Sequence, residues 1–267
     1  MNPIAIVIVN YNQLLKNSSI FQSNVMCNEN SIFVVDNSTN VEIQRQNEAY
    51  CENREDAVYL SLKQNLGISK AYNLAIEEIR KRDFQYILML DADTQIAAEY
   101  LEEINSVIEK KKVDLILTII KTQGGVIMSP CKRGRFGFYT NYKTIDEIQT
   151  DNTLSAINSG MCISRKIWDT YQYDEGLFLD YVDHQFMIDF WQRGNKVSIL
   201  KNVEFKQDFS AESDDLQKAK FRYSIQMKDI KYYLEKNNYP RWCIRIHEIK
   251  RKLHIFLRSK SLKVFFW

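Results

Sequence analysis

Proline and glycine are scarce in this sequence, which has only three prolines and eight glycines in 267 residues. So few turn residues argue against a β-sandwich with many tight turns and against low-complexity linkers. The five cysteines stand far apart, at positions 27, 51, 131, 162 and 243, without a C-x-x-C pair or a metal-ligand spacing. An odd, scattered set predicts reduced thiols in a cytoplasmic protein rather than a disulfide framework.

Long hydrophobic runs are also absent. No stretch approaches the roughly 18 apolar residues that a membrane-crossing helix needs. The apolar run at 4–9 is short, has no basic residue before it and no small-residue cleavage site after it. We therefore interpret it as a buried strand rather than a signal peptide, and we expect a soluble or membrane-peripheral protein.

The net charge of +2 is unevenly distributed along the chain. Residues 241–267 contain eight Lys/Arg and one acidic residue, Glu248, which leaves 28 basic and 33 acidic residues elsewhere. The tail therefore carries +7 and the body −5. An apolar stripe at helical spacing runs through the tail: Trp242, Ile246, Ile249, Leu253, Phe256 and Leu257.

Two interpretations of this tail stay open. It is either a helix packed on the domain with a solvated basic side, or an amphipathic helix that docks on an anionic membrane surface. No recognised nucleic-acid-binding module accompanies the basic residues, so we expect no nucleic-acid partner.

Strand and helix patterns alternate along the first 120 residues. Apolar, β-branched runs predict strands at 4–9, 31–36, 57–62, 86–90 and 113–120, and helical periodicity predicts helices at 68–82 and 97–112. This alternation indicates an α/β fold with a doubly wound, mostly parallel sheet. Further on, the sequence predicts a loop or short hairpin after residue 121, strands within 154–164 and at 196–203, and helices at 183–193 and 213–236. We expect one domain over 1–210 and a helical, basic extension over 211–267.

Polar residues follow several of these strands directly. Asn10 and Tyr11 follow the first strand, Asp36 ends the second, and Asp91-Ala92-Asp93 follows the fourth. In a doubly wound sheet such strand ends meet at one edge, where ligands bind. Two carboxylates there can hold Mg²⁺ or Mn²⁺ against a diphosphate.

Simpler roles for these residues stay open at this point. Asp93 could cap the following helix, and Asp36 could form a turn. The loop before the helix at 68–82 carries Asn65 and Gly67. It is either only a turn, or a place where Gly67 lets the backbone approach ribose or phosphate.

A later acidic and aromatic segment, 173–194, contains the candidate general base. Asp183 is flanked by Tyr181, Val182 and Phe186, and partial burial among such residues favours a proton-accepting role. His184 is a rival base. An isolated histidine, however, is more often structural.

These motifs together resemble the inverting family 2 glycosyltransferases of GT-A fold, in particular the rhamnosyltransferase-like branch of bacterial polysaccharide synthesis. The resemblance covers about residues 4–203. It rests on the segments IAIVIVNYN, VVDNST, NLGISKAYNLAI, YILMLDADT, INSGMCISRKIW and YDEGLFLDYVDHQFMIDFWQRGNKV.

The resemblance implies a role for each matching residue. Asp36 would contact the base, Asp91 the ribose or metal-bound water, and Asp93 the metal. Asp183 would deprotonate the acceptor hydroxyl, so that one displacement inverts the sugar. The remaining implied residues of the nucleotide-sugar site are Asn10, Tyr11, Asn65, Gly67, Asn73, Ser159 and Gly160.

One element of the family pattern is missing. Members often have a histidine after the last sheet strand that completes the metal site, but 202–210 contains none. Gln207 or Asp208 is the candidate replacement, and Lys206 could pair with phosphate in place of part of the cation. The implied cofactor is Mn²⁺ or Mg²⁺.

The implied partners are a dTDP-rhamnose or UDP-hexose donor and a glycan or lipid-linked glycan acceptor, and homodimerisation stays open. A peripheral position on the inner face of the cell membrane would suit a lipid-linked acceptor. Two rival functions also stay open, a sugar-nucleotide nucleotidyltransferase and a non-catalytic nucleotide- or glycan-binding homologue.

Overall fold

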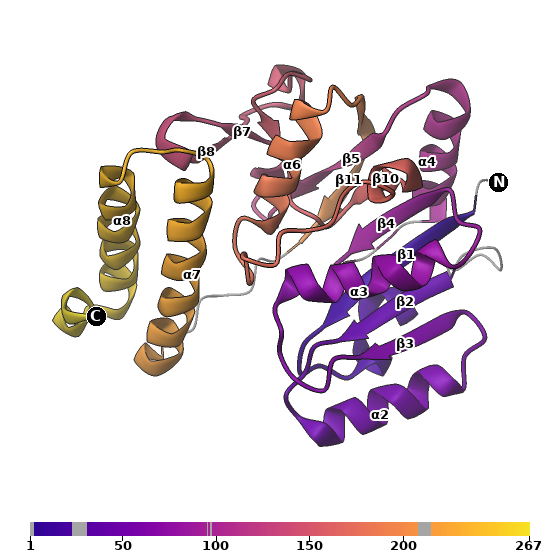
Figure 1. The fold of residues 1–267 in the computed structure, drawn as a ribbon, viewed down its shortest axis with the longest axis horizontal. Coiled ribbons are helices and arrows are strands. Elements are labelled where there is room, and N and C mark those ends of the chain that lie inside the picture. Colours follow the sequence, from indigo (N-terminus) through magenta and orange to yellow (C-terminus); the bar gives the residue numbers. More distant parts are fainter. Residues whose placement is uncertain (1–2, 23–30, 95, 97, 208–214) are drawn as a thin grey trace.

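A mostly parallel β-sheet runs through the centre of the molecule in the computed structural model, with helices on both faces and two long C-terminal helices at one side (Figure 1). The structure describes residues 3–22, 31–94, 96, 98–207 and 215–267. This architecture confirms the predicted fold class, including the helical C-terminal extension.

The main path of the sheet has the strand order β11-β5-β10-β4-β1-β2-β3, and β6 pairs with β5 at its side. All pairs along that path are parallel except those of β10, which is antiparallel to β4 and β5. The strands are β1 (Ile4–Asn10), β2 (Ser31–Asp36), β3 (Ala57–Ser61), β4 (Tyr86–Leu90), β5 (Leu115–Lys121), β6 (Ile127–Ser129), β10 (Met161–Ser164) and β11 (Val197–Lys206).

Each central strand is apolar throughout because both of its faces are covered. In β1, Ala5 and Val7 belong to one hydrophobic cluster, whereas Ile4, Ile6 and Ile8 belong to the other, and all five are fully buried. Alternating side chains of a strand point to opposite faces, so the continuous run at 4–9 is explained by two cores rather than one.

Helices close the two faces. They are α1 (Ser19–Gln22), α2 (Val41–Glu52), α3 (Ile68–Arg80), α4 (Ala98–Lys110), α5 (Arg165–Trp168) and α6 (Val182–Gln192). The buried residues of α3 join the first cluster and those of α4 the second. The sequence did not predict α2, which begins after Asn40; the side chain of Asn40 accepts hydrogen bonds from the amides of Glu42 and Ile43.

A small three-stranded sheet lies beside the main one. It consists of β7 (Cys131–Arg133), β8 (Tyr139–Asn141) and β9 (Leu154–Ser155), in the order β8-β7-β9. The antiparallel β7–β8 pair confirms the predicted hairpin after residue 121.

The basic tail is a helix packed against its predecessor. Asp215 caps α7 (Leu216–Lys236), and α8 (Trp242–Ser259) follows after a short turn and leads into the 3₁₀ segment Leu262–Phe266. Tyr233 and Cys243 are buried in the first cluster, so the extension contributes to the main core. The proposed boundary after 210 falls outside the described residues, and the division into two domains stays a prediction. Within the described ranges, no helix has both the length and the apolar composition needed to cross a bilayer.

Candidate active site

The polar strand ends meet at one edge of the sheet, as the sequence predicts. The register pairs Asn10 of β1 with Asp36 of β2, and Asp36 with Ser61 of β3. On the other side of β1, Ile8 pairs with Leu90, the residue before Asp91. Four consecutive parallel strands therefore place their last polar groups beside one another.

Asp36 is fully buried and its carboxylate is held by the protein. One oxygen accepts a hydrogen bond from the amide of Ser38 (3.0 Å), which is the predicted turn geometry. The other accepts from Asn47 Nδ2 of α2 (3.1 Å) and from the Tyr59 hydroxyl of β3 (2.9 Å). Asp36 thus joins β2, β3 and α2 at the strand edge. Its contact with a nucleoside base stays a prediction.

The other residues expected around the nucleoside differ in exposure. Tyr11 is 47% exposed, whereas Asn10 is buried and its Oδ1 has no hydrogen-bond partner in the protein. Asn65 Oδ1 accepts from Asn37 Nδ2 (3.0 Å) and from the amide of Gly67 (3.1 Å). These bonds bring the loop before α3 against the end of β2.

Gly67 and Asn73 bind another part of the chain, the segment that leads to Asp183. Gly67 has φ +90°, and a Cβ placed on it would lie 2.6 Å from the carbonyl oxygen of Phe178. Asn73 donates to the carbonyl of Tyr173 (3.0 Å) and accepts from its amide (2.9 Å). The close approach that requires glycine is therefore made by protein backbone, and a contact of either residue with the nucleoside stays a prediction.

Asp91 lies at the mouth of the sheet in a partly buried position. Burial raises the pKa of its carboxyl to about 6, and the nearby charges of Asp93 and Asp183 add to the rise, while a hydrogen bond from Gln207 lowers it. Gln207 Nε2 lies 2.5 Å from Asp91 Oδ2. The electrostatic influence of Asp183 places it near Asp91, although the two residues are more than 90 positions apart.

Ser159 and Gly160 lie next to the turn that contains Asp91. The amide of Asp91 donates to Ser159 Oγ (3.2 Å), which also lies 3.1 Å from Thr94 Oγ1. Gly160 has φ +79°, and a Cβ there would lie 3.0 Å from Thr118 Cβ. Ser159 thus holds the Asp91 backbone and the Gly160 amide donates to Met89 O (2.8 Å) of the adjoining strand, while a direct contact of either residue with a nucleotide sugar stays a prediction.

Asp93 is solvent-exposed and borders a hollow of about 310 Å³ formed with residues 13–19. The alternative role as a helix cap is wrong, because α4 begins five residues later, at Ala98. Among the described residues, no group of three or more His, Cys, Asp or Glu side chains could hold a metal ion. Asp208 lies outside the described residues.

Gln207 supplies a further side-chain oxygen beside the carboxylates of Asp91 and Asp93. Its Oε1 is buried and has no hydrogen-bond partner in the protein, while its Nε2 is bound to Asp91. Amide and carboxylate oxygens are the ligands that hard divalent cations prefer. The donor set of Asp91, Asp93 and Gln207 therefore fits Mg²⁺ or Mn²⁺ chemically.

Asp183 lies in the first turn of α6 and borders a cavity of about 490 Å³. The preceding Tyr181 has φ +65°, a conformation that is unusual for a bulky side chain and common at functional sites. The Tyr181 ring stacks on Tyr233 of α7, with centroids 4.6 Å apart. The strained turn and the stacked ring direct the start of α6, and so Asp183, into the cavity.

Comparison with known proteins identifies the family. The profile of glycosyl transferase family 2 matches residues 6–171, more than half of the chain. The chain belongs to this family. Its predicted membership is thereby confirmed.

Individual relatives agree with the family. The dTDP-rhamnosyl transferase RfbF of Shigella flexneri is 23% identical over 200 residues, which are 74% of this chain and 66% of the relative. The chain thus spans just under two thirds of that protein. S. aureus TarS 1-349 in complex with UDP-GlcNAc has a TM-score of 0.55 at 17% identity, covering 85% of this chain and 66% of that one. GalNAc-T7 with UDP, GalNAc and Mn²⁺ has a TM-score of 0.60 at 13% identity, covering 84% and 48%. These structures share the fold.

His184, the rival base of this family 2 chain, is part of the cavity wall. Its ring stacks on Tyr139 of β8, with centroids 3.6 Å apart, and its Nδ1 lies 2.7 Å from Ser155 Oγ. Burial lowers the pKa of His184, so the ring is neutral near pH 7. A neutral, stacked and hydrogen-bonded imidazole supports the wall beside Asp183.

No pattern in the sequence indicated which residues of α7 hold the Asp183 segment. Asp229 is fully buried and accepts hydrogen bonds from the amides of Phe178 (3.0 Å), Leu179 (2.8 Å) and Asp180 (2.8 Å). Arg222 forms an ion pair with Asp180. No local pattern could reveal these contacts, because the partners lie 42 to 51 positions apart.

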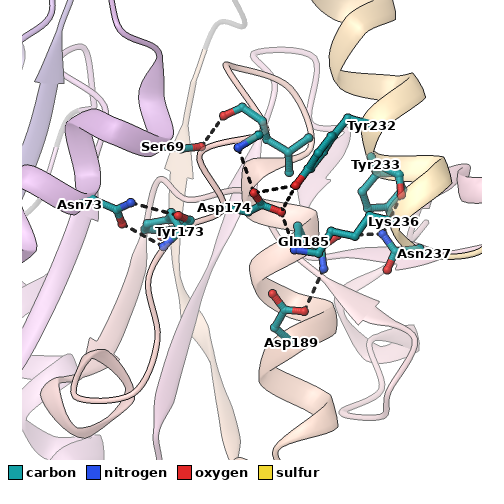
Figure 2. Close-up of polar contacts among 12 residues, drawn as sticks. Ser69, Asn73, Tyr173, Asp174, Gln185, Asp189, Tyr232, Tyr233, Lys236 and Asn237 are labelled. Carbon is teal, nitrogen blue, oxygen red and sulfur yellow. Dashed lines mark hydrogen bonds and ion pairs between the residues drawn. The ribbon is translucent and has the colours of Figure 1, made fainter.

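Figure 2 shows the same segment held from both sides. Asn73 of α3 faces Tyr173, while Tyr232 and Lys236 of α7 face Asp174. The Tyr232 hydroxyl lies 3.0 Å from Asp174 Oδ1. Residues 173–183 therefore form a strap between α3 and α7 that ends in the candidate base.

Proposed function

We propose that this chain transfers a sugar from a nucleoside-diphosphate sugar to a hydroxyl group of a glycan or lipid-linked glycan in bacterial surface polysaccharide synthesis, with inversion at the anomeric carbon. The observation that supports the proposal is that the charges of Asp93 and Asp183 both act on the Asp91 carboxyl, so that the three carboxylates lie near one another. Asp91 and Asp93 lie at the strand edge, and Asp183 lies close enough to raise the pKa of Asp91. We call the strand edge the donor side and the Asp183 cavity the acceptor side.

The proposed reaction is a single displacement. The acceptor oxygen attacks the anomeric carbon as its proton passes to the Asp183 carboxylate. The bond from that carbon to the diphosphate oxygen breaks, and its electron pair leaves with the diphosphate. Proton removal by one positioned carboxylate contributes about 10²- to 10⁴-fold to the rate in enzymes of this kind.

A divalent metal belongs to the same proposal. Asp91, Asp93 and Gln207 Oε1 are the residues that would hold it, with Asp208 as a further candidate. When bound, it would neutralise the charge that develops on the departing diphosphate. GalNAc-T7, which shares the fold, has a solved structure with Mn²⁺.

Two carboxylate variants test the proposal because they separate donor binding from transfer. Asp93→Asn should weaken Mn²⁺-dependent binding of the donor, whereas Asp183→Asn should leave donor binding intact and slow transfer by about 10²- to 10⁴-fold. Calorimetric titration with donor and a nucleotide-release assay measure the two quantities. Release that is unchanged in both variants would show that the site is assigned wrongly.

The donor is proposed to carry dTDP or UDP. RfbF is named as a dTDP-rhamnosyl transferase, and TarS has been solved with UDP-GlcNAc. A thermal-shift screen of dTDP-rhamnose and UDP-hexoses, with and without Mn²⁺, identifies the donor, since a ligand at 100 times its Kd stabilises the fold by about 2.7 kcal/mol.

The apolar stripe on α8 supports docking on an anionic membrane. Five of its six members are exposed side chains: Trp242 (47%), Ile246 (40%), Ile249 (57%), Leu253 (44%) and Leu257 (61%). The sixth, Phe256, is partly buried, and its ring lies 5.3 Å from that of Phe265. The face packed against the domain carries the buried Cys243, His247 and Ile255 instead. An apolar face flanked by a tail of charge +7 complements an anionic lipid surface, where each basic residue contributes about 1 kcal/mol. This would place the chain at the inner face of the cell membrane.

Vesicle pelleting tests the docking surface with a matched pair of variants. Ile249→Gln with Leu253→Gln should abolish binding to vesicles that contain anionic phosphatidylglycerol, while Val126→Gln, at an equally exposed apolar residue outside the stripe, should not. Retained binding by the stripe variant would contradict the proposal. A dimer in solution that dissociates in the stripe variant would assign the stripe to a second copy of the chain.

A further inference from the structure

One carboxylate of the C-terminal extension is fully buried. Asp229 of α7 has none of its surface exposed to solvent, and it forms no ion pair with any residue that the structure describes. Burial of a carboxylate costs free energy unless hydrogen bonds or an opposite charge compensate for it. The hydrogen bonds of Asp229 therefore show what this side chain holds.

Three consecutive backbone amides of the strap bind the Asp229 carboxylate. The Phe178 amide donates to Oδ1 (3.0 Å). The amides of Leu179 and Asp180 both donate to Oδ2, each at 2.8 Å. Successive amides of an extended chain point in opposite directions, so three of them meet one side chain only where the chain curves around it. These bonds therefore define the course of the backbone from 178 to 180.

The strap is bonded to α3 on its other side. The carbonyl oxygen of Phe178 accepts from the Ile68 amide (2.7 Å), and that of Leu177 accepts from the Ser69 hydroxyl (2.6 Å). The amide and the carbonyl of Phe178 thus bind different helices. If the bonds to α7 were lost, the bonds to α3 would still keep the strap on the domain. We therefore expect a change at Asp229 to shift the strap rather than to unfold the chain.

The same face of α7 holds the end of the strap. Tyr233 follows Asp229 by four positions and Arg222 precedes it by seven, so the three side chains lie along one side of the helix. Arg222 forms an ion pair with Asp180, and the Tyr233 ring stacks on Tyr181 with centroids 4.6 Å apart. One helix face therefore holds the strap up to the residue before α6 begins.

Asp183 follows this held segment closely. Only Tyr181 and Val182 separate it from Asp180, and three residues of chain span at most about 10 Å. A shift of the strap therefore reaches the Asp183 carboxylate. A misplacement of about 1 Å can cost a catalytic group about 10²-fold in rate. The place of the candidate base thus depends on α7.

We infer that Asp229 is a positioning residue for sugar transfer. Its carboxylate holds the strap amides and so keeps the Asp183 carboxylate within reach of the attacking hydroxyl, while Asp229 itself is not among the residues that line the cavity. The inference rests on the proposed function, because it takes Asp183 to be the general base. It gives α7 a part in the reaction besides its packing against α8.

Asp229→Asn tests the inference in the full chain. Asparagine has the size of aspartate, but an amide nitrogen replaces one oxygen and cannot accept from the strap amides. Nucleotide release from dTDP-rhamnose or a UDP-hexose is measured with a radiolabelled donor and with water as the acceptor, since water also gives up a proton as it attacks. We expect kcat to fall at least about tenfold, and the KM and Kd of the donor to change less than about twofold.

A double-mutant cycle separates positioning from a loss of folded protein. Once Asp183 is replaced by asparagine, its position no longer matters for proton removal, so the further change Asp229→Asn should lower kcat less than about twofold. A loss of folded protein would lower kcat by the same factor in both backgrounds, and that result would overturn the inference. If Asp183→Asn alone leaves kcat unchanged, or if the wild type releases no nucleotide, the proposed function itself fails.

Two further variants complete the test. Arg222→Gln removes the ion pair with Asp180 from a side chain that is 37% exposed, so it tests the same hold on the strap if Asp229→Asn does not fold. It should lower kcat about three- to tenfold, and only while Asp183 is present. Equal losses in the two backgrounds would contradict the inference here as well. Glu235→Gln removes a charge from an exposed residue of α7 and should change kcat less than about twofold in either background.

Discussion

The donor side and the acceptor side of this molecule are built in different ways. The donor side consists of the ends of neighbouring strands, and Asp36 and Asp91 stand at the end of, or directly after, the buried runs that place them. The acceptor side is a cavity between α6, α7, α8 and the β7–β8 hairpin, and its one catalytic candidate, Asp183, ends a strap of irregular chain.

This difference shows where rigidity comes from on each side. Asp91 is held by Ser159, which lies just before β10, and by Gln207, which directly follows β11. The strap before Asp183 is neither helix nor strand, so other elements supply the partners of its backbone groups. Its amides donate hydrogen bonds to Asp229 of α7, and its carbonyl oxygens accept hydrogen bonds from α3. We therefore expect substitutions on the donor side to act mainly through the charge of the carboxylates. Substitutions in the strap should act mainly through the position of Asp183.

The largest effect should come from Asp183→Asn, which keeps the shape of the side chain and removes proton acceptance. We expect transfer to fall about 10²- to 10⁴-fold, with the Kd of the donor nearly unchanged. Steady-state nucleotide release with acceptor, together with donor titration, measures both quantities. His184→Gln is the matched neighbour and should cost less than about tenfold, because His184 supports the wall. A reversed order of the two losses would make His184 the base.

The strap itself is tested by Gly67→Ala. A methyl group there would lie 2.6 Å from Phe178 O, and φ +90° is unfavourable for alanine. We expect the free energy of unfolding to fall by about 2–4 kcal/mol and turnover to fall with it. Gly124→Ala, where the nearest atom lies 3.7 Å away and φ is not positive, is the control and should be neutral. If denaturant unfolding finds both variants as stable as the wild type, the strap does not depend on this contact.

A smaller, opposite effect on stability should follow from Asp91→Asn. The pKa of Asp91 is about 6 in the folded chain, above its ordinary value of 3.8, so the folded state binds this proton more tightly than the unfolded state. The contribution of Asp91 to the free energy of unfolding therefore decreases as pH rises from about 4 to 6 and stays low above that.

Replacing that carboxylate should stabilise the metal-free chain at pH 7.5 by about 1–3 kcal/mol and leave it unchanged near pH 4. Denaturant unfolding in EDTA at the two pH values measures the difference. Mn²⁺ should stabilise the wild type and not the variant. A less stable variant at pH 7.5 in EDTA would show that the buried charge is compensated within the protein.

The sequence predicted the donor side well because its information is local. The runs at 4–9, 31–36 and 86–90 are read as buried strands, and Asn10, Asp36 and Asp91 come into place with them. On the acceptor side only Asp183 was predicted. Its supports were not, since Asn73 meets Tyr173 across 100 positions and Asp229 meets Phe178 across 51. Such contacts depend on how helices pack, which no single-sequence pattern specifies.

One element of the donor side was also not predicted from the sequence. The helix α2 has few apolar residues, and only Asn47 and Cys51 are buried. Its periodicity is therefore weak, although it supplies the Asn47 amide that binds Asp36 at 3.1 Å. A polar helix is positioned by its cap and by specific hydrogen bonds rather than by an apolar stripe.

The smallest predicted effect tests this view of α2. Asn40→Ala removes the side chain that accepts from the amides of Glu42 and Ile43, and the loss of such a cap costs about 1 kcal/mol. Because Asn47 and Gln44, which bind Asp36 and Tyr59, still hold α2 at the site, we expect a small decrease in the free energy of unfolding and a donor Kd within about threefold of the wild type. Asn53→Ala, at the other end of the same helix, is the control. If Asn40→Ala abolished donor binding, this prediction would be wrong. The donor side would then depend on α2 as strongly as the acceptor side depends on the strap.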